Sequence, residues 1–282
     1  MKFENIQRLL CPVCAGDVVH DAGRFSCKAC STSFPVVDGI PDFYPEDNPF
    51  SPRLFNLKDK YEDFGQDTVR PDSFQNIRRR RLTTELVEGR DALELGAAEG
   101  WMTRELVGRA GNVVSSDISL NYLKRARQDA PQADFLRLDA HCLPFMDSSF
   151  DCVIITEVLE HVYCPYRVLE EVHRVLRPDG KLVLSVPNNL SSSNILRHLV
   201  NRPGRQMDAH LSFYDMFSLE QLFGFVGFAV EKSCTAFVYL PVLKPLFRSN
   251  GLQKFLQKIA KNFGDKIVVR ARKTGESRWQ EL

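Results

Sequence analysis

Five short apolar runs recur between residues 91 and 187, and an amphipathic or loop-rich segment separates each from the next. The runs are DALEL (91–95), NVVSSD (112–117), DFLRLD (134–139), FDCVIIT (150–156) and KLVLSVP (181–187). Such runs predict buried strands, and their alternation with helical segments predicts a doubly wound parallel sheet. Ligands of these sheets bind outside the carboxyl ends of the strands, so the residues that close the first four strands are the binding candidates.

The turn after the first predicted strand, GAAEG (96–100), precedes a predicted helix, WMTRELVGR. Gly96 and Gly100 permit a tight turn and a close approach of a ligand, and Ala98 keeps the middle of the turn small. A pyrophosphate favours bare backbone N–H groups at a helix N-terminus, whereas Glu94 and Glu99 make this turn acidic. The turn therefore predicts a cationic ligand rather than a dinucleotide.

Two further acids close the next two predicted strands. Asp117 lies 23 residues after Glu94, where an acidic side chain can accept hydrogen bonds from ribose hydroxyls. Asp139 ends the third strand, and with the backbone near Ala140 it can face an adenine edge. A single acid at a strand end is commonly a structural cap, but three in succession favour a ligand that carries an unphosphorylated ribose.

Four of the eight cysteines form two Cys-x-x-Cys pairs that twelve residues separate. The predicted metal ligands are Cys11, Cys14, Cys27 and Cys30. Two such knuckles complete a tetrahedral zinc site, and four protein ligands make that site structural rather than catalytic. A pair of redox dithiols is the alternative. The remaining thiols are expected to be small core residues: Cys142, Cys152, Cys164 and Cys234.

Four motifs in order resemble those of class I S-adenosylmethionine-dependent methyltransferases, of the methyltransferase type 11-like kind, over about residues 76–273. They are ELGAAEG, SSDIS, LDAHCLPFMDSSFDCVIITEVLEHV and HRVLRPDGKLVLSVPN. Residues of about 8–46, with their DGIP turn, are similar to the zinc ribbons of methyltransferase-activating subunits. The resemblance implies an α/β fold: a Rossmann-like seven-stranded methyltransferase sheet with a small N-terminal zinc ribbon. It also implies a final antiparallel strand, DKIVVRARK.

The same resemblance implies S-adenosylmethionine as cofactor, with Ile118 packed on its adenine. The implied cofactor-binding residues are Glu94, Gly96, Ala98, Gly100, Asp117, Ile118, Asp139, Ala140 and Thr156. Glu94 stands where aspartate is commoner in the family, and Ala98 replaces a frequent glycine. Both departures keep charge or small size, so cofactor binding is still expected.

Two histidines are the candidate catalytic residues. Methyl transfer is an in-line displacement, in which an oxygen acceptor gains from a base that removes its proton. His161 follows the fourth strand in TEVLEHV, and His210 lies beyond the fifth strand. The alternatives are a part of the site wall for His161 and a structural cap for His210. Glu160 is expected at the same wall, and His141 beside the adenine.

The expected acceptor is a small molecule, a lipid precursor or a glycan, methylated on oxygen. Methyltransferases of nucleic-acid amines usually carry an Asn/Asp-Pro-Pro-aromatic turn after the fourth strand, and TEVLEHV stands in that place here. An RNA methyltransferase that uses the ribbon for recognition is the alternative. A net charge of +1 gives no overall field for nucleic acid. A non-catalytic cofactor-binding partner is the third hypothesis.

The expected organisation begins with a zinc ribbon at 1–46 and a linker with helical lead-in at 47–75. A methyltransferase domain at 76–273 follows, with an insertion or lid at 234–264 and a tail at 274–282. Residues 252–263 predict a basic amphipathic helix that packs on its own domain, covers the acceptor or contacts a membrane peripherally. The chain shows no secretory signal or membrane span, so a cytoplasmic location is expected. The oligomeric state is not predicted.

Four consecutive arginines lie in SFQNIRRRRLTTEL, residues 73–86. The segment predicts a helix whose buried stripe is Ile77, Leu82 and Leu86. Two interpretations remain for the arginines: a solvated helix with one arginine turned inward, or a contact with an anion or phosphate.

Overall fold

The computed structural model describes residues 9–44, 73–199, 210–238, 251, 255 and 262–275. Three sequence predictions fall largely outside these residues. They are the linker at 47–75, the amphipathic helix at 252–263 and the tail at 274–282. Within the described part of the chain, no helix has the length and apolar character that a membrane crossing requires.

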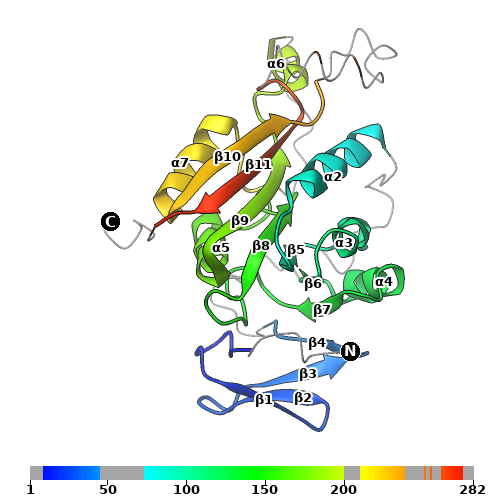
Figure 1. The fold of residues 1–282 in the computed structure, drawn as a ribbon, viewed down its shortest axis with the longest axis vertical. Helices are drawn as coiled ribbons and strands as arrows, with labels where there is room; N and C mark the ends of the chain where they lie inside the picture. The colour runs from blue at the N-terminus through cyan, green and yellow to red at the C-terminus, as the bar shows by residue number, and fades with distance from the viewer. Residues whose placement is uncertain are drawn as a thin grey trace.

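A seven-stranded sheet forms the centre of the larger unit (Figure 1). Its strands are β5 (Asp91–Leu95), β6 (Asn112–Asp117), β7 (Asp134–Arg137), β8 (Phe150–Thr156), β9 (Leu176–Pro187), β10 (Phe228–Thr235) and β11 (Lys266–Lys273). The order across the sheet is β10-β11-β9-β8-β5-β6-β7. Strands β5 to β9 pair in parallel, and β11 pairs antiparallel with both β9 and β10. The predicted fold class and the antiparallel final strand are confirmed.

Helices cover both faces of this sheet (Figure 1). They are α2 (Phe74–Leu86), α3 (Trp101–Val107), α4 (Leu120–Asp129), α5 (Pro165–Val175) and α7 (Met216–Val226). Helix α6 (Ser192–Leu199) lies beyond the end of the sheet (Figure 1). Helix α2 packs on β9 and β11, and α3 and α4 pack on β6, whereas α5 and α7 pack against each other and on β9 and β10. Side chains cap the helix starts: Ser119 accepts from the backbone N–H of Tyr122, and Asp215 forms a capping box with Ser218.

A separate four-stranded antiparallel sheet lies at the β7 end of the molecule (Figure 1). It consists of β1 (Val18–Asp21), β2 (Arg24–Cys27), β3 (Ser33–Val37) and β4 (Ile40–Pro41). The predicted DGIP turn joins β3 to β4, with Asp38 and Gly39 both at positive φ. Of the four predicted metal ligands, Cys27 ends β2, Cys11 and Cys14 precede β1, and Cys30 lies between β2 and β3. We call residues 9–44 the ribbon.

The ribbon shares a hydrophobic core with the large sheet. Phe25, Phe34 and Phe43 are buried, and they belong to one cluster with side chains from the sheet and from α5 and α7. Backbone hydrogen bonds continue across the boundary: Phe43 N–H donates to the Arg137 carbonyl at 2.8 Å. The ribbon therefore extends the β7 edge of the sheet.

A buried ion pair crosses the same boundary. Arg137 Nη1 lies 2.9 Å from Asp42 Oδ2, and the two side chains are 6% and 13% exposed. The same guanidinium donates through Nε to the Ile118 carbonyl at 2.8 Å. Arg137 therefore connects the ribbon to the chain directly after β6.

The predicted apolar stripe of α2 is correct only in part: Leu86 packs against a core cluster and Leu82 is partly buried, but Ile77 does not belong to it. Ile77 is 47% exposed, and the buried residues of the helix are Arg80 and Thr83. Arg80 pairs with Glu105 on α3 at 3.2 Å, and Arg78 Nε donates to the Ala236 carbonyl at 2.7 Å. Arginine stems can cover apolar surface while their charged ends find partners, so this helix packs through its arginines. More than one of them turns inward.

Candidate active site

The turn between β5 and α3, residues 96–100, has the tight backbone conformation that its two glycines predict. Gly96 and Gly100 both have positive φ, where a side chain is strained. A Cβ on Gly96 would lie 2.2 Å from Val158 Cγ2, and one on Gly100 would lie 2.8 Å from Ala126 Cα. Ala98 also has positive φ, at 46°, so the turn keeps the glycine-like conformation despite the methyl group.

The Asp117 carboxylate joins that turn to the start of α4. Asp117 Oδ2 accepts from the Ala98 N–H at 2.9 Å, and Oδ1 accepts from the Ser119 N–H at 2.9 Å. The side chain is only partly buried, as is that of Ile118. Each carboxylate oxygen has a second lone pair, so the group can accept further hydrogen bonds on its exposed side.

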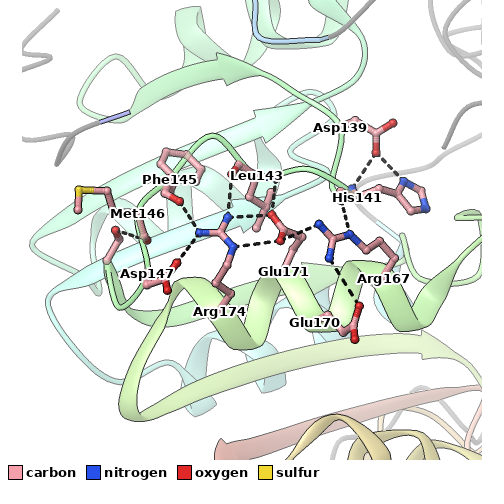
Figure 2. A network of polar contacts seen from close by, with 11 residues as sticks. Asp139, His141, Leu143, Phe145, Met146, Asp147, Arg167, Glu170, Glu171 and Arg174 are labelled. Atoms are coloured by element: carbon pink, nitrogen blue, oxygen red, sulfur yellow. Dashed lines mark hydrogen bonds and ion pairs between the residues drawn. The ribbon is translucent and has the colours of Figure 1, made fainter. Parts of the chain in front are cut away.

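Asp139 and Ala140 lie beyond the end of β7, the next strand along. Asp139 Oδ1 accepts from the backbone N–H of His141 at 2.8 Å and lies 2.6 Å from His141 Nδ1 (Figure 2). Farther along the same loop, Arg174 on α5 donates to the carbonyls of Leu143 and Phe145 (Figure 2). These contacts fix the loop that follows β7.

Glu94 is turned into the protein rather than toward the exposed edge. Its Oε2 accepts from Thr103 Oγ1 at 2.6 Å and from Ser115 Oγ at 2.7 Å, and the residue is 1% exposed. Its buried Oε1 has no hydrogen-bond partner among the described residues. Burial raises the pKa of Glu94 to about 7, although the two hydroxyls oppose the shift. Through these two hydrogen bonds, the Glu94 side chain connects α3 to β6.

The raised pKa of Glu94 predicts that Glu94→Gln stabilises the free protein at alkaline pH. Below about pH 4.5 both folded and unfolded chains hold the proton, so the carboxyl carries no penalty. Between pH 4.5 and about 7 only the unfolded chain loses it, so the free energy of unfolding falls, and it stays lowered above that range. Because one pKa unit corresponds to about 1.4 kcal/mol, glutamine should gain about 3 kcal/mol at pH 8.

Denaturant unfolding at pH 4, 6 and 8 without ligand measures this gain. Glu85→Gln, which neutralises a carboxyl that is 57% exposed on α2, is the matched control and should show no such rise with pH. A difference between Glu94→Gln and the unmodified protein that stays constant over these pH values would contradict the assignment.

The two candidate catalytic histidines meet beyond the end of β8. The ring centroids of His161 and His210 lie 4.9 Å apart at an interplanar angle of 70°. Leu211 N–H donates to the Glu160 carbonyl at 2.7 Å, and Ser212 N–H donates to the same oxygen at 3.2 Å. These two bonds hold the segment that carries His210 against the loop that carries His161.

Glu160 completes the cluster. Its side chain is 2% exposed, Oε1 lies 3.9 Å from His161 Nε2, and Oε2 has no hydrogen-bond partner among the described residues. Burial, and next the charge of Glu157, raise the pKa of Glu160 to about 8. Burial lowers the pKa of His210, and the neighbouring His161 adds to this effect. Near neutral pH, His210 is therefore an uncharged imidazole.

Sequence reasoning missed a charged group next to this cluster. Glu157 forms an ion pair with Lys266 and accepts from Ser185 Oγ at 3.2 Å, and Arg79 Nη1 donates to the same hydroxyl at 3.4 Å. Burial alone would raise the pKa of Glu157, but the charges of Lys266 and Arg79 lower it on balance. The available signals were the acid directly after β8 and the arginine run of α2.

The four ribbon cysteines fit a tetrahedral zinc ion. Their Sγ atoms all lie within 4.8 Å of one another, with Cys11 to Cys30 at 3.7 Å and Cys14 to Cys27 at 3.4 Å. Zinc–sulfur bonds of about 2.3 Å in a tetrahedron place the sulfurs about 3.8 Å apart. Backbone N–H groups of Ala29 and Cys30 point at Cys27 Sγ. Of the other cysteines, Cys142 and Cys152 are buried as expected, whereas Cys164 and Cys234 are half-buried.

Strands β8, β5, β6 and β7 are neighbours in the sheet, so their carboxyl ends share one edge. That edge carries all nine predicted cofactor residues, including Thr156 at the end of β8, although Glu94 points inward. The exposed side of the edge is a glycine turn next to the partly exposed Asp117 carboxylate, whereas Asp139 is buried against His141. The orphaned Glu94 oxygen is buried as well. Fold and edge together resemble those of the class I S-adenosylmethionine-dependent methyltransferases.

The comparisons with known proteins agree with this class. Residues 93–184 match the family described as methyltransferase domain. Demethylmenaquinone methyltransferase of Renibacterium salmoninarum is 38% identical over 114 residues, which cover 39% of this chain and 48% of that protein. Ubiquinone/menaquinone biosynthesis C-methyltransferase UbiE of Hahella chejuensis is 35% identical over 113 residues, covering 36% and 45%. Over residues 93–184 this chain is therefore similar to methyltransferase domains. It spans about half the length of these curated relatives.

Solved structures share the fold at low identity. A chain from the complex of the Haloferax volcanii Trm112 methyltransferase activator with a methyltransferase is 21% identical, with a TM-score of 0.58. The match covers 77% of this chain and 98% of that one. A methyltransferase from Thermotoga maritima is 18% identical, with a TM-score of 0.60 and coverages of 77% and 100%.

Proposed function

We propose that the protein transfers a methyl group from S-adenosylmethionine to an oxygen of a small-molecule acceptor. One observation carries the proposal: the partly exposed Asp117 carboxylate lies hydrogen-bonded to the glycine turn, at the edge that also carries Asp139. An acidic edge of this kind suits a cationic nucleoside and opposes a pyrophosphate.

The residues of the edge divide the work of holding the cofactor. The partly exposed carboxylate of Asp117 accepts the ribose hydroxyls, and Ile118 packs on the adenine. The backbone from Gly96 to Gly100 contacts the methionine portion. Both glycines are needed for this turn, because a Cβ at Gly96 would clash with Val158 and one at Gly100 with Ala126. When bound, S-adenosylmethionine supplies a methyl group that its sulfonium has already activated.

The cluster of Glu160, His161 and His210 serves the acceptor. An acceptor hydroxyl has to lose its proton as its oxygen attacks, and an uncharged imidazole within reach accepts that proton at a ring nitrogen. The lowered pKa of His210 keeps this histidine in the accepting form near neutral pH. The pair Glu157–Lys266 behind the cluster fixes the loop after β8.

The comparisons and the charge of the chain support the proposed class of acceptor. One relative is named a demethylmenaquinone methyltransferase and another a ubiquinone/menaquinone biosynthesis C-methyltransferase, and both names support a small-molecule acceptor. Lipid precursors and glycans belong to the proposed class as well. A net charge of +1 argues against RNA as the acceptor.

Incubation with a methyl-labelled donor and separated small-molecule, lipid, glycan, RNA and protein extracts tests the proposal. We expect label in a small-molecule fraction and none with Asp117→Ala. Label in RNA would support the alternative acceptor, and a product methylated on carbon would contradict transfer to oxygen. Failure of every fraction to take label, despite tight donor binding, would favour a non-catalytic cofactor-binding protein.

A further inference from the structure

Three potential metal ligands converge beyond the end of β8, apart from the ribbon cysteines. One ligand atom from each of Glu160, His161 and His210 lies within 4.8 Å of the other two. Two imidazoles and one carboxylate form a common protein set for divalent transition metals, and they leave coordination positions open for water or substrate. The cluster can therefore bind a metal ion as well as accept a proton.

The buried carboxyl points to a ligand more strongly than proximity does. Glu160 has a side chain that is 2% exposed, and its Oε2 is without a hydrogen-bond partner among the described residues. Leaving a buried polar atom unpaired costs about 1–3 kcal/mol, and native proteins carry few such atoms without a reason. A cation bound by both oxygens of this carboxylate would satisfy Oε2.

The two loops that carry the ligands are already fixed. Leu211 and Ser212 donate to the Glu160 carbonyl, so His210 is held beside Glu160 by the backbone. His161 N–H donates to the Val158 carbonyl at 2.9 Å, which closes the turn after β8. Metal–ligand bonds of about 2.1 Å require ligand atoms roughly 3.0–3.5 Å apart, so the side chains need to close by about 1 Å only.

The charges around the cluster permit a divalent ion. Lys266 and Arg79 are the nearby cations, and Lys266 is engaged by Glu157, whereas Arg79 donates to Ser185. Glu157 offsets the charge of Lys266, so an added ion enters beside a lysine that already has a partner.

We propose that Glu160, His161 and His210 bind a divalent transition-metal ion at the acceptor side of the domain. Binding of the ion does not depend on methyl transfer. The role of the ion in methyl transfer rests on the proposed function. A bound ion occupies the imidazole nitrogens that would otherwise accept the proton of the acceptor. The ion instead lowers the pKa of an acceptor hydroxyl that coordinates it, so that this hydroxyl releases its proton to water before its oxygen takes the methyl group. The favoured acceptors then carry two neighbouring oxygens that can chelate the ion.

Cobalt(II) titration of the full chain, with its ribbon first loaded with one equivalent of zinc, tests the proposal without donor or acceptor. We expect one further equivalent to bind by calorimetry, with an absorption spectrum that lacks thiolate-to-metal bands. Removal of an outer partner of a metal ligand commonly weakens affinity about 10–100-fold, so His161→Ala or His210→Ala should weaken it at least 100-fold. Glu160→Gln should also weaken it.

His198→Ala is the matched control, since His198 is exposed on α6 and its ring bonds to the Asn194 carbonyl of its own helix. This variant should bind cobalt as the unmodified protein does. Absence of a second equivalent in the unmodified protein, or equal binding by all variants, overturns the proposal. Melting temperature and S-adenosylmethionine affinity of each variant show that it has folded, and they report on the cofactor site separately.

Discussion

Removal of zinc from the ribbon should unfold residues 9–44 and weaken binding of S-adenosylmethionine by the methyltransferase domain. The ribbon is too small to hold a core without help, and a four-cysteine zinc site supplies about 10–16 kcal/mol in comparable peptides. Loss of the ion also exposes Phe25, Phe34 and Phe43, which the ribbon shares with the large sheet. We therefore expect a large fall in melting temperature.

We expect zinc removal to affect cofactor binding through the contacts of Arg137. This buried guanidinium contacts Asp42 in the ribbon and the carbonyl of Ile118, the residue proposed to pack on the adenine. When the ribbon unfolds, Arg137 loses its carboxylate, and the edge strand β7 loses its added backbone partner at Phe43. Calorimetry with S-adenosylmethionine before and after chelation should show a fall in affinity of about 10-fold or more, since about 1.4 kcal/mol suffices.

Two aspartates of the ribbon separate this route from general unfolding while zinc stays bound. Asp42→Ala leaves a buried arginine without its carboxylate, which lowers stability by about 3–5 kcal/mol in comparable pairs. This variant should also bind the cofactor more weakly. Asp38→Ala is the control, because Asp38 pairs with Lys124 across the same boundary but is 66% exposed. Equal cofactor affinity for the two variants would show that the ribbon does not influence the cofactor site through Arg137.

The sequence predicted the central strands because each contains a short apolar run, and the strands are buried on both faces. Strand β10 (Phe228–Thr235) has no such run: it is an edge strand with Glu231 and Lys232 exposed, so periodicity gives a weak signal there. The predicted stripe of α2 was wrong at Ile77 for a different reason. Hydrophobicity does not reveal that the stem of Arg80 is buried against Glu105 on another helix.

The candidate site was predictable to the extent that it lies at strand ends. The turn at Gly96 and the acids Asp117 and Asp139 follow from topology, because parallel neighbours end at one edge. The pair Glu157–Lys266 joins residues 109 positions apart, and no spacing rule connects them. The contact of His161 with His210 likewise depends on backbone hydrogen bonds between two loops.

Asp117→Ala is expected to reduce the affinity for S-adenosylmethionine about 100-fold or more while the domain stays folded. Hydrogen bonds to a charged group contribute about 1.5–3 kcal/mol each, and the proposed site gives both ribose hydroxyls to this carboxylate. The substitution also removes the acceptor of the Ala98 and Ser119 N–H groups, so part of the loss would arise from a looser glycine turn. A single affinity measurement cannot separate these two contributions.

A double-mutant cycle with a 2′-deoxyribose analogue of the cofactor separates them. If Asp117 binds the ribose directly, the unmodified protein should discriminate strongly against the analogue, and Asp117→Ala should discriminate little. If the carboxylate only shapes the turn, both proteins should lose the same factor with the analogue. Asp129→Ala, at the exposed end of α4, is the control for charge alone and should bind both compounds as the unmodified protein does. An equal loss of affinity for the analogue in the unmodified protein and in Asp117→Ala would place the ribose away from β6. A carboxylate that accepts a hydrogen bond from the sugar must lose binding energy when that hydroxyl is missing.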